Sequence, residues 1–481
     1  MRINKKIMLS VVGVALSMMV VAQQNVADYV KKMVEEPDFE SATIGISIYN
    51  ATTGQSIYSY NENKSLIPAS IQKLLTTSAG FEELGANFRF RTSIGYVGEL
   101  DKKGVLQGDV VIVGGGDPIL GSYRYKQTAI DSVFAKWYEI LSVMGVKVIG
   151  GHLCFDASIY DDRPLHDSWM WGDIGNYYGC GVHGLNIHEN MYFAHFDAGA
   201  ALNQKATLIN VTPKDIDLIS EVNVTTGEAG SGDRVVIYGP PIDNVRLCTG
   251  TVPLGKKNFK IRGSLPNPPK TCAELFAKYL NKKGIAVAND VVKTSKPKRD
   301  VTMVFDYYSP NYAEIVAYAN QTSNNIYVES IYKYLGYKKY KVGTFETGSH
   351  AINDYLKAHN LSTKGIRIVD GSGLSRMNMM TARFMTDFLT EVSKQPYYTD
   401  YLRTLSQIGK SGTAKNMLKN TNLKRDIYIK SGSMNGIKSY AGYIVGNNGD
   451  VITFCFMVNN FKCSGTKVGK KLEQILLMLI D

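Results

Sequence analysis

The sequence predicts an α+β protein in which strands from both ends of the chain form one antiparallel sheet flanked by helices. Residues 44–60 alternate between apolar and polar side chains on both sides of a short turn, which is typical of a hairpin. A helical pattern begins after Pro68, and an amphipathic stretch at 467–480 predicts a second helix. Three further predicted strands lie near the end of the chain: 427–431, 439–445 and 451–458. Together these segments predict a five-stranded sheet.

A long, strand-rich segment interrupts this pattern. It alternates short strands with turns and holds a cluster of prolines at 266–269, and a lysine- and proline-containing stretch at 293–299 is suited to lead the chain back. We therefore expect one domain made of residues 23–88 and 300–481, with an inserted region at 89–299 between its two parts. With 481 residues, 44% of them hydrophobic and 20% charged, the chain is long enough for two or three packed domains.

The first 22 residues have the pattern of a signal peptide. Arg2, Lys5 and Lys6 precede an apolar run at 7–21, and Ala22 provides a small residue for cleavage. Export would place the chain in the periplasm or another extracytoplasmic space, where we expect no nucleic-acid partner. Contact with wall polymers or lipid head groups and simple solubility explain the net charge of +11 equally well.

Cysteines and histidines give little sign of a metal or redox centre. The six cysteines are too sparse for a disulfide scaffold and form no Cys-x-x-Cys motif, although a short chain reversal could pair Cys455 with Cys463. A zinc site is an alternative, but its candidate ligands lack the His-Glu-x-x-His spacing. These candidates are His183, His188, Glu189 and His195. We therefore expect no metal and no cofactor.

The strongest candidate for chemistry is a serine and a lysine at the start of the helix after Pro68. A spacing of three places the Lys73 amine one turn along from Ser70, on the same helix face. A serine nucleophile needs a neighbouring base, and a partly desolvated lysine can supply one near neutral pH. Amide dipoles at the helix start favour the negative charge that develops during attack. Ser70 is therefore the predicted nucleophile and Lys73 its base.

Position distinguishes this pair from others with the same spacing. Ser-x-x-Lys recurs at Ser295, Ser330 and Ser464, but only Ser70 lies between a hairpin and an apolar helix. A Ser-His-Asp hydrolase is unsupported because no Gly-x-Ser-x-Gly occurs. The glycines at 114–116 lack the spacing of a phosphate loop.

A second element, Ser323 to Asn325, lies at a predicted helix edge. Ser323 could relay a proton, and the Asn325 amide could hold an amide group of a substrate. Helix capping explains a Ser-x-Asn triplet equally well, and similar triplets begin at Ser59, Ser309 and Ser433.

A third element needs a cation beside a hydroxyl on a strand. We choose Lys430, Ser431 and Gly432 over the similar run at 410–412, because only the former ends an alternating segment. Lys430 and Ser431 could bind a terminal carboxylate there, while Gly432 permits close backbone approach.

In this order, the three elements form the motif set of class A β-lactamases and penicillin-binding proteins. From about residue 40 to its end, the chain resembles a low-molecular-mass class C penicillin-binding protein of the D-Ala-D-Ala carboxypeptidase and endopeptidase family, peptidase family S13. Four more stretches carry the likeness: 114–118 (GGGDP), 177–190 (YYGCGVHGLNIHEN), 309–315 and 370–376 (DGSGLSR). The resemblance implies a penicillin-binding, serine β-lactamase-like domain, interrupted by a mostly β insertion of two smaller domains, one nested in the other.

The resemblance also implies a role for each motif residue. Asp156 in the insertion and Arg376 would hold a side chain of the stem peptide, although a surface salt bridge explains them equally well. The other implied roles are Ser70 as nucleophile, Lys73 as base, Ser323 as proton relay, Asn325 as substrate clamp, Lys430, Ser431 and Gly432 in carboxylate recognition, and the amides of Ser70 and Ser433 as oxyanion hole.

The implied activity is that of a serine-type D-Ala-D-Ala carboxypeptidase or D,D-endopeptidase. It would act on peptidoglycan stem peptides through an acyl-enzyme, with β-lactams as covalent inhibitors. Ser431 stands where the family usually has threonine, and Asn324 where aspartate is common, while the loop at 410–416 (KSGTAKN) differs in a way that bears on substrate preference. A noncatalytic peptidoglycan-binding scaffold and a β-lactamase remain as alternatives; the intact motifs weigh against the first, and the long insertion against the second.

Overall fold

The computed structural model describes residues 23–240, 243–294, 300–447 and 449–480, so the predicted signal peptide and most of the predicted linker lie outside the described residues. The described residues form two compact units. The first unit comprises 23–86, 316–323 and 352–480, and the second comprises the described part of 87–315 together with 324–351. Asn325 therefore groups with the inserted region. Within the described part of the chain, no helix has the length and apolar character needed to cross a bilayer.

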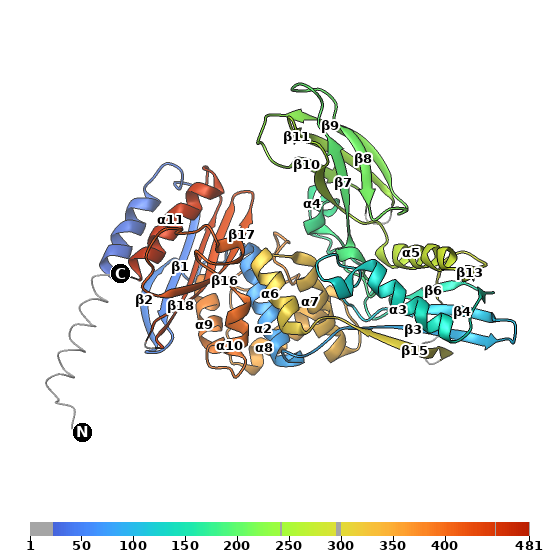
Figure 1. Cartoon of the computed structure of the whole chain (residues 1–481). Coiled ribbons are helices and arrows are strands. Elements are labelled where there is room, and N and C mark those ends of the chain that lie inside the picture. The colour runs from blue at the N-terminus through green and yellow to red at the C-terminus, as the bar shows by residue number, and fades with distance from the viewer. Residues whose placement is uncertain (1–22, 241–242, 295–299, 448, 481) are drawn as a thin grey trace. The chain divides into compact units, whose positions relative to one another are not determined.

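The first unit is built on a six-stranded antiparallel sheet whose strands come from both ends of the chain (Figure 1). The strand order is β16-β17-β18-β19-β1-β2, and β1 pairs with β19 so that Ile48 lies opposite Phe454. The α+β class and the five predicted strands are confirmed. The structure adds β16, which at two residues is too short to show alternation. The strands are β1 Thr43–Asn50, β2 Gln55–Tyr60, β16 Ser406–Gln407, β17 Asp426–Met434, β18 Ile437–Val445 and β19 Val451–Asn459.

Helices cover both faces of this sheet because successive strand residues point to opposite faces. Ile48 belongs to a core shared with the helical residues 23–34 and with α11. Ser47 points the other way, and its Oγ lies 2.9 Å from Thr386 Oγ1 of α9. Burial on both faces explains why β19 is apolar at nearly every position. The helices are α2 Lys73–Leu84, α9 Ala382–Val392, α10 Tyr398–Thr404 and α11 Gly465–Met478, with α6 Tyr312–Thr322 and α8 Phe345–Ala358 shared between the units.

The second unit contains three sheets and one main apolar core. The largest has seven strands, in the order β13-β5-β4-β3-β15 with β6 joining β4 and β14. Trp137 of α3 packs edge-on against Phe276 of α5 in the core. Two three-stranded sheets, β10-β11-β9 and β12-β7-β8, come between β6 and β13 in the sequence.

The elements of the second unit have the following bounds: β3 Arg91–Leu100, β4 Val105–Val113, α3 Ile130–Val143, β5 Val148–Ile149, β6 Leu153–Asp156, α4 Trp171–Ile174, β7 Met191–Asp197, β8 Thr207–Thr212, β9 Ile219–Gly227, β10 Arg234–Tyr238, β11 Val245–Pro253, β12 Phe259–Ser264, α5 Pro268–Lys283, β13 Ala286–Val287, β14 Val292–Lys293, β15 Thr302–Tyr308 and α7 Asn325–Tyr340.

The expected pairing of Cys455 with Cys463 is wrong. All six cysteines, each within the described residues, are free thiols. Cys455 is completely buried inside β19, between its strand neighbours Ser47 and Ala441, whereas Cys463 follows the end of that strand. The chain reversal after β19 therefore does not bring the two sulfur atoms together.

Asp117 is a buried acid in the turn after β4. Its Oδ1 accepts a hydrogen bond from Ile119 N at 2.8 Å, but Oδ2 has no hydrogen-bond partner among the described residues. Burial raises the pKa of Asp117 to about 7, although the amides of Ile119 and Leu120 oppose the shift. The ionised carboxylate is therefore disfavoured in the folded unit.

We expect Asp117 to make the second unit less stable as the pH rises from about 4 to about 7. The pKa of Asp117 is higher in the folded state than in the unfolded state. Its contribution to stability is therefore fully present below the unfolded-state pKa and is lost as the pH rises through the folded-state pKa. At about 1.4 kcal/mol per pH unit, this loss is at most about 4 kcal/mol. Asp117→Asn, which cannot ionise, should remove this part of the pH dependence.

Urea unfolding between pH 4.5 and 8, followed by tryptophan fluorescence, measures this effect. The fluorescence reports on the second unit because it holds all three tryptophans, Trp137, Trp169 and Trp171. The prediction would be contradicted if the free energy of unfolding changed with pH by the same amount in the unaltered chain and in the Asp117→Asn variant.

Candidate active site

Ser70 and Lys73 meet at the start of the helix that follows Pro68. Ala69–Gln72 form one turn of 3-10 helix, and α2 continues from Lys73. Lys73 Nζ donates a hydrogen bond to Ser70 Oγ at 2.9 Å and another to Ser372 O at 2.7 Å. The Lys73 side chain is completely buried, whereas Ser70 is partly exposed. An amine is thus held against an accessible hydroxyl.

The backbone around Ser70 is closely packed against the sheet. Ala69 has a φ of +49°, which is unfavourable for a residue with a β-carbon. Ser439 Oγ of β18 donates to Pro68 O at 2.6 Å. A β-carbon on Gly432 of β17 would lie 2.9 Å from Ser70 N, so glycine permits β17 to run beside the amide of Ser70.

Lys430 of β17 forms a second lysine-serine pair. Its buried Nζ donates to Ser323 Oγ at 2.9 Å and to Ser431 O at 2.8 Å. Burial, followed by repulsion from Lys73 and Lys438, holds the pKa of Lys430 well below its ordinary value of 10.5. A bound carboxylate would offset this repulsion, which suits Lys430 to an anionic substrate.

The DGSGLSR segment is fixed by the buried carboxylate of Asp370. That carboxylate accepts hydrogen bonds from Gly373 N at 2.8 Å and from Ser375 N at 2.6 Å. The Asp370 backbone oxygen accepts from the Gln72 side chain, one residue before Lys73. The segment is thereby anchored where it presents Ser372 O to Lys73.

The other predicted site side chains of the first unit are exposed or partly exposed. Arg376 Nη2 donates to Asn435 O at 3.2 Å. Ser431 is partly exposed, and its Oγ lies 3.1 Å from Thr413 Oγ1. Ser433 is exposed at the end of β17.

Asn325 and Asp156 belong to the second unit. Asn325 is the first residue of α7, and its Nδ2 donates to Tyr178 O at 2.7 Å. Asp156 ends β6, is buried, and accepts a hydrogen bond from Ser158 N at 2.8 Å. The structure thus gathers Ser70, Lys73, Ser323 and Lys430 in the first unit and places Asn325 and Asp156 in the second.

The competing Ser-x-x-Lys runs have different surroundings. Lys333 Nζ binds Asp161 Oδ1 at 2.7 Å instead of a serine. Ser464 caps α11 through a hydrogen bond from Lys467 N at 3.2 Å. Ser295 lies outside the described residues. Of the three runs within the described residues, only that of Ser70 has a hydrogen bond between the lysine amine and the serine hydroxyl.

The alternative third element and the suggested zinc ligands are also engaged elsewhere. Lys410 is exposed and pairs with Asp426 at 3.0 Å. Within the described part of the chain, no three His, Cys, Asp or Glu residues gather as a metal site. Glu189 accepts hydrogen bonds from Arg124 Nε at 2.7 Å and Tyr327 Oη at 2.9 Å, and His195 contacts Asn258 and Thr212.

Two contacts, one in each unit, lay beyond what the sequence pattern could show. Thr413 reaches Ser431 from a loop whose sequence does not resemble a strand. Glu189, considered above only as a metal ligand, receives the hydroxyl of Tyr327, two residues after Asn325. Nothing in the sequence spacing pointed to the contact between Glu189 and Tyr327.

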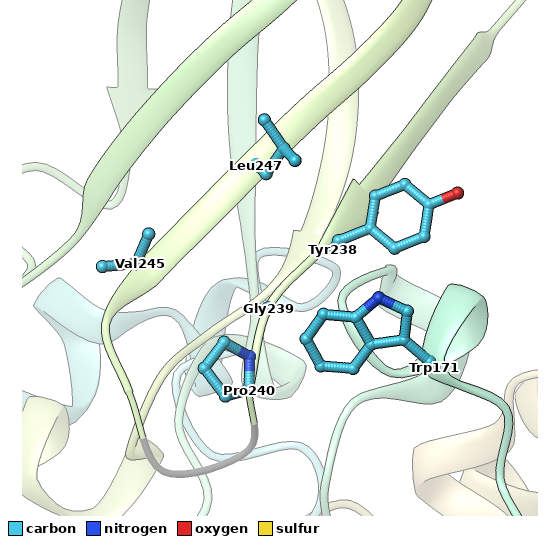
Figure 2. Close-up of a pocket in the computed structure, with 6 residues that line it drawn as sticks. All are labelled: Trp171, Tyr238, Gly239, Pro240, Val245 and Leu247. Carbon is cyan, nitrogen blue, oxygen red and sulfur yellow. The ribbon is translucent and has the colours of Figure 1, made fainter.

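A separate pocket of about 380 Å³ lies on the second unit, where Trp171 of α4 stacks on Tyr238 of β10 (Figure 2). Its lining is completed by Gly239, Pro240, Val245 and Leu247. Among the described residues, its lining includes none of the predicted site residues and no serine, lysine or carboxylate side chain. It therefore lacks the groups needed for acyl transfer.

A buried lysine on a partly exposed serine, with a second lysine-serine pair beside it on an α+β fold, defines a serine acyl-transfer enzyme of the penicillin-recognising class. Comparison with known proteins specifies the family. The chain belongs to the D-Ala-D-Ala carboxypeptidase 3 (S13) family, whose model matches residues 25–479. This membership confirms the predicted enzyme class, a serine-type D-Ala-D-Ala carboxypeptidase.

Individual relatives agree with the family assignment over most of their lengths. The D-alanyl-D-alanine carboxypeptidase of Actinomadura sp. (strain R39) is 28% identical over 433 residues, covering 87% of this chain and 78% of that protein. D-alanyl-D-alanine carboxypeptidase DacB of Haemophilus influenzae is 24% identical over 459 residues, covering 93% and 91%. The crystal structure of penicillin-binding protein 4 (dacB) from H. influenzae matches the fold with a TM-score of 0.78 at 23% identity, covering 92% of this chain and 94% of that one.

Proposed function

We propose that this chain cleaves D-alanyl peptide bonds of peptidoglycan stem peptides, with Ser70 as nucleophile. The observation that carries the proposal is the hydrogen bond of 2.9 Å between the buried Lys73 amine and Ser70 Oγ, in a member of the S13 family. The hydrogen bond from Lys430 to Ser323 Oγ adds a second proton-transfer pair in the same unit.

In the first step, the Lys73 amine takes the proton of Ser70, and Ser70 Oγ attacks the carbonyl carbon of the penultimate D-alanine. The amides of Ser70 and Ser433 would stabilise the oxyanion. The close approach of β17 to Ser70 N at Gly432 supports this arrangement. The carbon-nitrogen bond then breaks as Ser323, held by Lys430, delivers a proton to the leaving nitrogen.

In the second step, water attacks the acyl-enzyme carbonyl, the ester bond to Ser70 Oγ breaks, and the serine regains its proton. The shortened stem peptide leaves with a new carboxylate. This route draws on no cofactor. Terminal D-alanine is the leaving group in carboxypeptidase action, and the D-amino acid of a crosslink is the leaving group in endopeptidase action.

Substrate recognition follows from the remaining motif residues. Lys430 and Ser431 would bind the carboxylate next to the leaving nitrogen, and Asn325 would hold an amide of the peptide. Asp156 and Arg376 would contact the stem-peptide side chain. Burial and the neighbouring positive charges lower the pKa of Lys430, and a bound carboxylate would offset both effects.

We also propose an extracytoplasmic location, with export by residues 1–22. β-Lactams would acylate Ser70 because they present a strained amide to the same nucleophile. In support, the H. influenzae penicillin-binding protein 4 structure complexed with a β-lactam matches this fold with a TM-score of 0.78. Peripheral contact of the basic chain with wall polymers or lipid head groups belongs to the same proposal.

The domain assignment completes the proposal. Residues 23–88 and 300–481 would form the catalytic domain, and 89–299 the insertion. The six-stranded sheet from both chain ends supports this division, and the position of β7 to β12 between β6 and β13 supports a nested second inserted domain.

A turnover assay tests the function directly. The purified chain should release free D-alanine from an N-acyl peptide ending in D-Ala-D-Ala, and one equivalent of penicillin should stop the release. Crosslinked muropeptides, tested in parallel, report endopeptidase action. Penicillin labelling without peptide cleavage would instead favour the β-lactamase or the scaffold, and rapid hydrolysis of the penicillin would distinguish the former.

A further inference from the structure

The loop after β16 brings a hydroxyl to the edge of the predicted carboxylate site. Thr413 is exposed in the 3-10 turn Gly412–Ala414, and its Oγ1 lies 3.1 Å from Ser431 Oγ. Both residues belong to the first unit. The two hydroxyls are close enough to contact the same anion.

The loop that carries Thr413 is held in place by its own hydrogen bonds. Thr413 N donates to Ser406 Oγ at 3.2 Å, and Gly409 N donates to Ala414 O at 3.1 Å. Ser406 is completely buried on β16, where it lies opposite Ile429 of β17. The Thr413 hydroxyl is therefore positioned relative to the strand that carries Ser431.

Gly412 shows how closely the loop packs. Its φ is +59°, and a β-carbon there would lie 2.1 Å from Ser406 Oγ. Only glycine fits this position, which lets the next residue direct its side chain toward β17. The backbone conformation of the loop thus positions Thr413 for its contact with Ser431.

The chemistry of the site calls for further donors. A carboxylate has about four lone-pair positions to satisfy, and Ser431 supplies one hydroxyl. The Lys430 amine already donates to Ser323 Oγ and Ser431 O. Ser431 lacks the methyl group that restricts a threonine side chain to fewer rotamers, so a neighbouring hydroxyl can also orient it.

We propose that the Thr413 hydroxyl joins Lys430 and Ser431 in the subsite for the carboxylate adjacent to the leaving nitrogen, and that Thr413 thereby contributes to the selection of substrates with a free carboxylate. This inference rests on the proposed function, because it assigns Ser431 to that carboxylate. It adds a contact residue from a loop outside the three motifs.

The test compares two substrates that differ only at this group: an N-acyl peptide ending in D-Ala-D-Ala and the same peptide as its C-terminal amide. Thr413→Val keeps the branched shape and removes the hydroxyl. The ratio of kcat/KM for the acid to kcat/KM for the amide should fall about tenfold, as expected for the loss of one hydrogen bond to a charged group, with most of the change in KM. Thr413→Ser, which retains the hydroxyl, should restore the ratio.

The outcomes separate this inference from the function on which it rests. If the unaltered chain cleaves neither peptide, the proposed function and the inference both fail. If the unaltered chain is active but Thr413→Val keeps the acid-to-amide ratio, or Thr413→Ser loses it equally, only the inference fails. Thermal unfolding of each variant checks that the fold is retained, which the exposure of Thr413 leads us to expect.

Discussion

Replacing Ser70 with alanine should abolish covalent labelling of the chain by fluorescent penicillin, with a loss of more than about a thousandfold in the acylation rate. The reason is chemical, because the acyl group has no oxygen to which it can bond once Ser70 Oγ is removed. Ser70 is partly exposed and lies at a helix start, so the smaller side chain fits without strain. Gel fluorescence after incubation with the label measures the outcome.

Ser464→Ala provides the matched control for this experiment. Ser464 also begins a Ser-x-x-Lys run, but it caps α11, and the amine of Lys467 pairs with Asp38. Its loss should cost about 1 kcal/mol of stability and leave labelling intact. Labelling that persists in Ser70→Ala would contradict the assignment of the nucleophile.

Lys73→Met should slow acylation by about a thousandfold, within the range that a general base contributes. Methionine has a similar length and is apolar, so it can occupy the buried position of Lys73 while removing the amine that contacts Ser70 Oγ at 2.9 Å. Because Ser70 remains, slow labelling should continue over long incubation. The progress of labelling at several penicillin concentrations separates the acylation rate from binding.

Lys467→Met is the control for the charge and the spacing. Lys467 lies three residues after Ser464, is half exposed and pairs with Asp38. This substitution should leave the acylation rate unchanged. Acylation of Lys73→Met at the rate of the unaltered chain would exclude Lys73 as the base and require another group near Ser70.

The sheet of the first unit could be predicted because its signals are local. Ile46 and Ile48 alternate with polar or small residues, and β19 is a short, nearly continuous apolar run, so each of these strands is visible in a short window of sequence. The pairing of these strands across the chain rested on analogy between the two ends, and the register of Ile48 opposite Phe454 could come only from the structure. β16 could not be predicted because two residues are too few to show an alternation of apolar and polar side chains.

The site shows the same division between local and distant information. A spacing of three on one helix places Lys73 on Ser70, and this contact is present in the structure. The contact of Lys430 with Ser323 joins residues 107 positions apart, and order along the chain suggested it without fixing its geometry. Thr413 was passed over because a hydroxyl on a glycine-containing loop has no periodic signature.

The error at Cys455 has a related origin. Closeness in sequence suggested a bond to Cys463, but strand geometry decides where a side chain points. Cys455 lies on the buried face of β19 shared with Ser47, and a residue beyond the strand end does not reach it. A short separation in sequence therefore does not by itself predict that two side chains near the end of a buried strand are in contact.

The position of β1 between β2 and β19 sets the order in which the chain can be assembled. Thr453 Oγ1 of β19 donates to Tyr49 O of β1, and these residues are 404 positions apart. The edge of β1 that pairs with β19 therefore stays unpaired until β19 has left the ribosome. Contacts of such separation form slowly, and an open strand edge invites association with other chains. The nucleophile is thus synthesised early, whereas the sheet that supports it closes last. A product cut short before β19 would keep Ser70 and Lys73 yet be an aggregation-prone fragment without activity.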